Sequence, residues 1–189
     1  MDKKIAQSLG TAMKRHEKGA VIAIEIPPAA HLKANAASVS LIMGMGYSGI
    51  YLTFHVPFED ILSDLKSQGA DMDKIIFVTC DAKKSGESRC VIVPKGCNVN
   101  DIIVAVGVAL PKLKSAKKFI FVDSLTTLSA SRQLAEALKF SEFLKRLIKE
   151  REVDMVILAF DSNDAVHMKF IEDTAIHVDE IVRLENTGY

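Results

Sequence analysis

Residues 117–128 are KKFIFVDSLTTL, a segment in which the apolar run 119–122 ends directly at Asp123. Aromatic and β-branched residues in succession favour a strand, and a run without polar interruption is typical of a strand buried on both faces. Such strands belong to parallel sheets that helices cover on both sides. We therefore expect an α/β protein built around this segment.

Similar apolar runs lie on both sides of it and predict a set of parallel strands: 21–26, 50–54, 75–79, 119–122 and 155–160. Helical periodicity or capping residues predict helices between them: 2–18, 30–45, 57–69, 100–114 and 131–150. Shorter elements are expected as an edge strand, a helix and a last strand: 91–93, 167–175 and 180–184. This alternation predicts three layers, a mainly parallel central sheet with helices on both faces. In such sheets ligands bind at the carboxyl ends of the strands.

The overall composition excludes several classes of protein. The 189 residues include 24 Lys+Arg and 24 Asp+Glu, so no net basic charge attracts nucleic acid or an anionic membrane. No apolar run reaches the roughly 18 residues of a membrane span, and the N-terminus lacks the apolar segment of a signal peptide. We expect one cytoplasmic domain, 1–189, with an N-terminal helix at 1–18 and a core at 19–185, and neither membrane nor nucleic acid as a partner.

The cysteines are few and contain no CxxC pair, which argues against a disulfide framework and a zinc ribbon: Cys80, Cys90 and Cys97. Cys90 and Cys97 flank VIVPKG, so we expect them to lie near each other across a turn. A local basic loop is interpreted as solvated, with a nucleic-acid contact as the alternative: Lys83, Lys84, Arg89 and Lys95.

Residues 117–128 also resemble the Walker B strand of the RecA superfamily, especially its KaiC-like branch, in which apolar residues run into Asp-Ser-Leu-Thr. Other segments resemble that family in matching order. Residues 46–71 are similar to its second strand and helix, 153–160 to the strand after Walker B, and 176–184 to the closing strand. The resemblance covers about residues 19–185 and implies a RecA/P-loop-NTPase-like fold.

The segment after the first strand, IPPAAHLK at 26–33, departs from the phosphate loop of that family. It contains no glycine, although a phosphate cradle needs backbone conformations that a Cβ atom disfavours. The resemblance places Ala29 and His31 at glycine positions, and Leu32 at the position of the essential Lys. Lys33 is offset by one residue, and we interpret it as a solvated helix residue or an anion contact.

A second departure follows the second strand, where KaiC-like ATPases carry an acid that activates the attacking water and this chain has His55 and Val56. Asp123 matches the Walker B acid, although it could instead cap the following turn. Phosphoryl transfer depends on positioning and charge neutralisation. The resemblance therefore implies no efficient ATP hydrolysis and no ATP or Mg²⁺ cofactor, with Lys33 and Asp123 left over from a nucleotide site.

Four further candidates each follow a different predicted strand: His31, His55, Asp123 and Asp161. Parallel strands would place them on one rim, where two imidazoles and two carboxylates could bind Zn²⁺ or another divalent ion. The alternative is a wet crevice lined by polar side chains that do not converge. No HxH or HExxH spacing supports a metal site, so we expect none.

The resulting hypothesis is a catalytically inactive domain, a pseudo-ATPase, that acts by protein association as a regulatory or scaffolding subunit. In the resembled family, subunits pack side by side with nucleotide at the interface. The resemblance therefore implies a homo-oligomer or an assembly with an active relative. Two alternatives are a nucleotide- or anion-binding sensor that uses Lys33 and the N-terminus of its helix, and a metal-dependent enzyme that uses the His/Asp rim.

Overall fold

The computed structural model describes the following residues: 3–16, 19–54, 56–80, 89–94, 96–124, 134–161 and 178–184. Its helices are α1 (Lys3–Arg15), α2 (His31–Gly44), α3 (Phe58–Ser67), α4 (Val99–Ala109) and α6 (Leu134–Lys149). Its strands are β1 (Ala20–Ile26), β2 (Ser48–Thr53), β3 (Ile75–Thr79), β4 (Cys90–Ile92), β5 (Lys118–Asp123), β6 (Met155–Asp161) and β7 (Glu180–Arg183). The helix expected at 167–175 lies outside the described residues.

The seven strands form one sheet in the order β4-β3-β2-β5-β6-β1-β7, and every neighbouring pair is parallel. The five predicted core strands are confirmed, and the edge and closing strands expected at 91–93 and 180–184 correspond to β4 and β7. Because all strands run the same way, their carboxyl ends share one edge of the sheet and their amino ends share the other. We call these the carboxyl edge and the amino edge.

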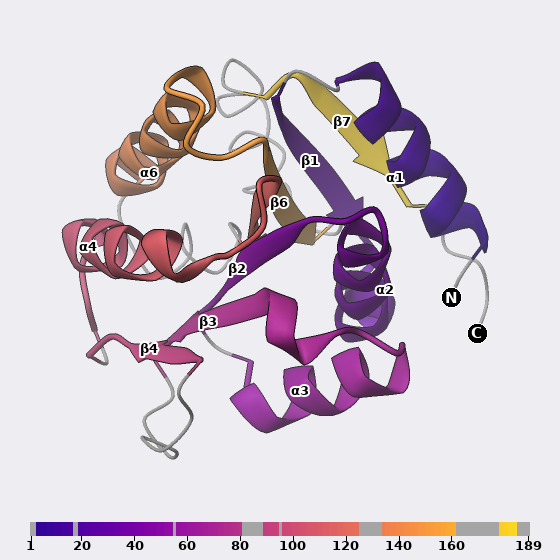
Figure 1. The fold of residues 1–189 in the computed structure, drawn as a ribbon, viewed down its shortest axis with the longest axis horizontal. Coiled ribbons are helices and arrows are strands. Elements are labelled where there is room, and N and C mark those ends of the chain that lie inside the picture. The colour runs from indigo at the N-terminus through magenta and orange to yellow at the C-terminus, as the bar shows by residue number, and fades with distance from the viewer. Residues whose placement is uncertain are drawn as a thin grey trace.

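Helices cover both faces of the sheet, which confirms the predicted three layers (Figure 1). α4 and α6 pack on one face, where the β-branched residues of β2, β5 and β6 meet their inner sides. α1, α2 and α3 pack on the other face, where the sheet presents most of its aromatic residues. Successive residues of a strand point to opposite faces, so an all-apolar strand supplies both layers at once.

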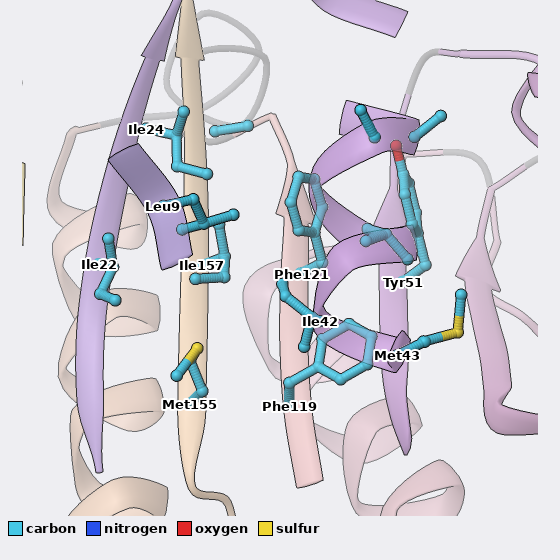
Figure 2. Packing of buried hydrophobic residues seen from close by; sticks show 14 of the residues in the cluster. Leu9, Ile22, Ile24, Ile42, Met43, Tyr51, Phe119, Phe121, Met155 and Ile157 are labelled. Atoms are coloured by element: carbon cyan, nitrogen blue, oxygen red, sulfur yellow. The ribbon is translucent and has the colours of Figure 1, made fainter. Parts of the chain in front are cut away.

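The face beneath α2 is packed by aromatic rings, and Figure 2 shows Tyr51, Phe119 and Phe121 side by side with Ile42 and Met43 of that helix. The Tyr51 and Phe121 rings stack with their centroids 5.2 Å apart. Phe119 lies beside Gly49, where an added Cβ would sit 2.4 Å from its ring. Packing of the ring therefore requires glycine at position 49.

α4 forms from the run IIVAVGVAL, which is rich in strand-forming residues. A capping box fixes its start, because the Asn98 side chain accepts from the Asp101 N–H while the Asp101 carboxylate accepts from the Asn98 N–H. The helix predicted at 100–114 ends earlier, at Ala109, and continues as the 3-10 turn Leu110–Lys112. No helix in the described part of the chain is long and apolar enough to cross a membrane.

Candidate functional site

The carboxyl edge holds a buried group of polar side chains around Asp123. Asp123 ends β5, and the sheet register pairs it with Thr53 at the end of β2. The Asp123 side chain is only 1% exposed. α2 begins at His31, a few residues after the end of β1, so its first turn lies over the same edge.

Both carboxylate oxygens of Asp123 contact a protein side chain. Oδ1 lies 2.6 Å from Nε2 of His31, and Oδ2 accepts a 2.5 Å hydrogen bond from the Tyr51 hydroxyl. Tyr51 precedes Thr53 by two residues in β2, so it faces α2 and its hydroxyl extends toward the carboxyl edge (Figure 2). We call His31, Asp123 and Tyr51 the Asp123 cluster.

The Tyr51 phenol keeps its proton at neutral pH. Complete burial, followed by the neighbouring Asp123 carboxylate, raises the pKa of Tyr51 well above its ordinary value of 10.0, and Asn35 acts in the opposite direction. These two contacts leave lone pairs on the carboxylate, but a side chain that is only 1% exposed can meet a substrate or a metal ion only if its neighbours move. The cluster is therefore arranged to hold Asp123 in place.

In the turn between β1 and α2, two backbone N–H groups donate to carbonyl groups of the same turn. Pro27 and Pro28 have no N–H group. The N–H of Ala30 donates to the Pro27 carbonyl at 2.9 Å, and that of His31 donates to the Pro28 carbonyl. The Leu32 side chain, at the position where the resembled family has Lys, packs against the apolar cluster beneath α1–α3. These donors do not converge on an external anion.

The buried side of α2 carries more polar groups than the sequence analysis identified. Asn35 and Ser38 are fully buried and follow His31 by four and seven residues, so the three lie along one side of the helix. Within the described residues, neither amide atom of Asn35 nor the Ser38 hydroxyl has a hydrogen-bond partner. The sequence signal for these residues was the spacing of four and three that places His31, Asn35 and Ser38 on one side of the helix.

Of the remaining predicted site residues, Lys33 alone has a side chain that the structure describes. Lys33 is exposed in the first turn of α2. His55 and the side chain of Asp161 lie outside the described residues, so only His31 and Asp123 of the predicted rim are seen together. The described residues contain no group of three or more His, Cys, Asp or Glu that could hold a metal ion. Among the described residues, the Asp123 side chain contacts His31 of α2 and Tyr51 of β2, and residues 125–133 of the following turn lie outside the described part of the chain.

The cysteine pair differs from the expected one. Cys80 directly follows β3, Cys97 lies just before α4, and their Sγ atoms are 3.5 Å apart. All three cysteines are thiols, and Cys90 lies in β4 opposite Phe77. The prediction paired Cys97 with Cys90, but the thiol found beside Cys97 belongs to Cys80. Parallel pairing of β3 and β4 brings the residues that follow the two strands to one edge, and this ordering is not visible in the local sequence.

The amino edge carries a pocket of about 270 Å³, which we call the amino-edge pocket. Its walls come from the beginnings of four adjacent strands, β2, β3, β4 and β5, or from the residues just before them. Four cationic side chains and one carboxylate line it, together with serine and leucine: Ser48, Asp73, Lys74, Arg89, Lys112, Leu113, Lys114 and Ser115. The pocket thus concentrates positive charge in a chain whose net charge is zero.

The four cations of this pocket are held to different degrees. Nη2 of Arg89 lies 3.1 Å from the Asp73 carboxylate, and the Arg89 guanidinium also donates to the Asp73 carbonyl. Lys74 lies 3.6 Å from a neighbouring aspartate. Lys112 and Lys114 are exposed and have no ion pair within the described residues. The other members of the predicted basic loop lie outside the described residues: Lys83, Lys84 and Lys95.

Comparisons with known proteins identify the fold. No protein-family model and no curated protein sequence matches the chain. Among solved structures, the KaiC-like protein PH0186 of Pyrococcus horikoshii OT3 superposes with a TM-score of 0.62 at 14% identity, over 91% of this chain and 74% of that one. The chain has a RecA/KaiC-like fold. The uncharacterized protein PH0321 of Pyrococcus horikoshii, solved with an unknown peptide, superposes with a TM-score of 0.67 at 10% identity, over 93% of this chain and 82% of that one.

Proposed function

We propose that this RecA/KaiC-like domain is catalytically inactive and acts by protein association, as a regulatory or scaffolding subunit. The observation that carries the proposal is the Asp123 cluster. A bound Mg²⁺ ion usually keeps several waters and uses one or two carboxylates, so it needs an acid that solvent can reach. The Asp123 carboxylate instead contacts His31 and Tyr51 inside a site that is almost closed to solvent.

The turn before α2 supports the same proposal. In phosphate loops, several backbone N–H groups point to one anion. Here two residues of the turn are prolines and the N–H groups of Ala30 and His31 bond within it. His31 contributes its side chain to Asp123, so the residue at a glycine position of the family contacts the acid directly. The nucleotide site is thereby replaced by an internal contact.

Protein association is the role that remains for such a domain. A RecA/KaiC-like fold without a nucleotide site still offers the faces through which such domains pack against one another. The neighbour PH0321 was solved with a peptide bound, so a similar fold can hold a polypeptide. We therefore propose self-association or a mixed assembly with an active relative.

ATP hydrolysis by the wild type and by Asp123→Asn tests the inactive site. Asparagine keeps the size of the side chain, so a loss of activity cannot be attributed to a cavity. We expect both proteins to hydrolyse Mg-ATP at the same background rate. A reproducible loss of turnover in Asp123→Asn would show that the acid is catalytic and would overturn the proposal.

Isothermal titration with Mg-ATP tests the turn before α2. Leu32→Lys restores the missing cation but leaves the backbone donors engaged within the turn. We therefore expect no binding by this variant at the carboxyl edge. Micromolar binding by Leu32→Lys and not by the wild type would show that the cradle is intact and would favour a nucleotide sensor.

Association is tested by sedimentation velocity over a wide concentration range, without and with Mg-ATP. We expect a species larger than the monomer. Its proportion should increase with protein concentration and should not depend on Mg-ATP. A monomer at all concentrations would rule out the homo-oligomer, and an assembly that needs ATP would contradict the inactive site. A mixed assembly would then be tested by adding a purified KaiC-like ATPase to the same experiment.

We propose anion binding at the amino-edge pocket as a second candidate function, because two of its four cations have no ion pair within the described residues. Inorganic pyrophosphate is a suitable probe for titration. We expect saturable binding that weakens with salt and is lost in Lys112→Gln/Lys114→Gln. Lys14→Gln/Lys149→Gln removes the same charge from exposed positions elsewhere and should bind normally. Equal binding by both double variants, or none by the wild type, would overturn this candidate.

A further inference from the structure

The strand β4 forms one edge of the sheet and is held by a short backbone ladder to β3. It has three residues, each at least partly exposed, and pairs with β3 at three positions. β3, in contrast, is buried along its whole length. Edge strands present backbone groups to which another chain can pair. Whether β4 stays in place therefore decides whether the edge of β3 is covered.

Two cysteines flank β4 in the sequence and lie side by side in space. Cys80 extends β3 by one residue, and Cys97 ends the connection from β4 to the Asn98 cap of α4. Their Sγ atoms, 3.5 Å apart, are already in contact. Forming a bond of about 2.05 Å requires each sulfur to move by less than an ångström if both move. Cys97 is 5% exposed, whereas Cys80 is only partly buried.

We propose that Cys80 and Cys97 form a reversible disulfide that fastens β4 to the sheet. The oxidant would be a low-molecular-weight disulfide. The more exposed Cys80 attacks as a thiolate on one sulfur of that oxidant, which forms a mixed disulfide and releases one thiol. Cys97, also as a thiolate, then attacks the Cys80 sulfur and releases the second thiol. The protein loses two protons and two electrons, and the oxidant gains them.

The bridge would act on the strand between the two cysteines. It would close the chain from 80 to 97, which contains all of β4, and tie both ends of that loop to β3 and α4. Closing a loop limits the ways in which it can open. In the oxidised protein β4 would therefore leave the sheet less often, and the β3 edge would be exposed to a pairing partner less often. In the reduced protein the strand is held by the short ladder, by the packing of Cys90 and Val91 and by the Arg89–Asp73 ion pair, without a covalent link.

Peptide mapping after treatment with oxidised glutathione tests the pairing. The full-length chain would be compared with Cys80→Ser, Cys97→Ser and Cys90→Ser, the last being the matched control. We expect the wild type and Cys90→Ser to lose two hydrogen atoms and to yield a peptide linked through 80 and 97 that dithiothreitol separates. A link through Cys90, or a wild type that keeps all its thiols, would overturn the proposal. The wild-type map decides the pairing even if a serine variant folds poorly.

Hydrogen exchange tests the consequence for β4. The N–H of Val93 bonds to the Thr79 carbonyl and the N–H of Phe77 bonds to the Arg89 carbonyl, so these two amides report on the β3–β4 ladder. On oxidation we expect the exchange of these two amides to slow by up to about tenfold in the wild type and in Cys90→Ser. In Cys80→Ser we expect their exchange rate to stay the same. A disulfide that forms without slowing these amides would show that it does not fasten the strand.

Discussion

The two edges of the sheet differ in the surroundings of their charged side chains. At the carboxyl edge one carboxylate is almost completely buried and both of its oxygens accept from protein groups. At the amino edge four cations surround an open pocket, and Lys112 and Lys114 have no ion pair within the described residues. A buried charge must be satisfied internally, whereas an exposed one is satisfied by solvent at little cost. The charge at the carboxyl edge is thus held inside the protein, whereas the lysines of the amino edge face solvent.

Removing His31 should give the largest effect. His31→Ala leaves Oδ1 of Asp123 buried without its partner, so we expect the free energy of unfolding to fall by about 3 kcal/mol. Chemical denaturation measures this. Adding Asp123→Asn to form a double-mutant cycle separates the loss of the contact from the loss of packing. A loss below about 1 kcal/mol would mean that the carboxyl edge is no more structural than a surface site.

Gly49→Ala tests the packing of the amino edge. Gly49 lies in β2 directly after Ser48, which lines the amino-edge pocket. The new Cβ would lie 2.4 Å from the Phe119 ring, which is fully buried and cannot move aside. We expect a loss of about 2 kcal/mol. Gly107→Ala is the matched control, because its Cβ would meet no atom within 4 Å and alanine favours a helix. Thermal unfolding should show that the control is neutral or stabilising, and equal effects would contradict the packing argument.

Tyr51→Phe tests the carboxyl edge through the pH dependence of the free energy of unfolding. At neutral pH we expect a loss of about 1–2 kcal/mol, because Asp123 loses one donor. The pKa of Tyr51 is raised in the folded state, so unfolding releases its proton once the pH exceeds the ordinary value of 10.0. Wild-type stability should therefore fall as the pH rises above about 10, and the gap to Tyr51→Phe should narrow. A constant gap between pH 8 and about 11 would show that Tyr51 is not held protonated by this site.

The smallest effect on stability is expected at the amino edge. Lys112→Gln/Lys114→Gln breaks no ion pair within the described residues, so its free energy of unfolding should stay within about 0.5 kcal/mol of the wild type. Urea denaturation at low and moderate salt measures it. A loss as large as that of His31→Ala would mean that these lysines support the fold, and that the two edges are alike.

Much of the fold could be predicted from the sequence because its strands are continuous apolar runs. β3 is found at its predicted residues, β1 and β6 differ from theirs by one residue at one end, and β5 differs by one residue at each end. The segment that became α4 was ambiguous, since its residues favour a strand while Asn100, Asp101 and its place between two strands favour a helix; the structure places the cap at Asn98. Burial of one helix side against the sheet overrides the local preference.

The candidate sites were predictable only in part. Asp123 and His31 were expected on one rim because each follows a strand, and the structure brings them into contact. Tyr51 was hidden inside an apolar run, where an aromatic residue gives no sign that its hydroxyl meets a carboxylate. The amino-edge pocket combines the beginnings of four strands that are far apart in the chain, so it depends on strand order, which local patterns do not specify.

The position of β1 between β6 and β7 affects how the protein is made. The ribosome completes β1 at Ile26, but neither of its partner strands exists before Met155 emerges. At about 5–20 residues per second, the segment AVIAIEI waits on the order of ten seconds without a strand to pair with. An apolar strand left unpaired for that time is prone to aggregate. The nascent chain, rather than the finished protein, is therefore the form that most needs a chaperone.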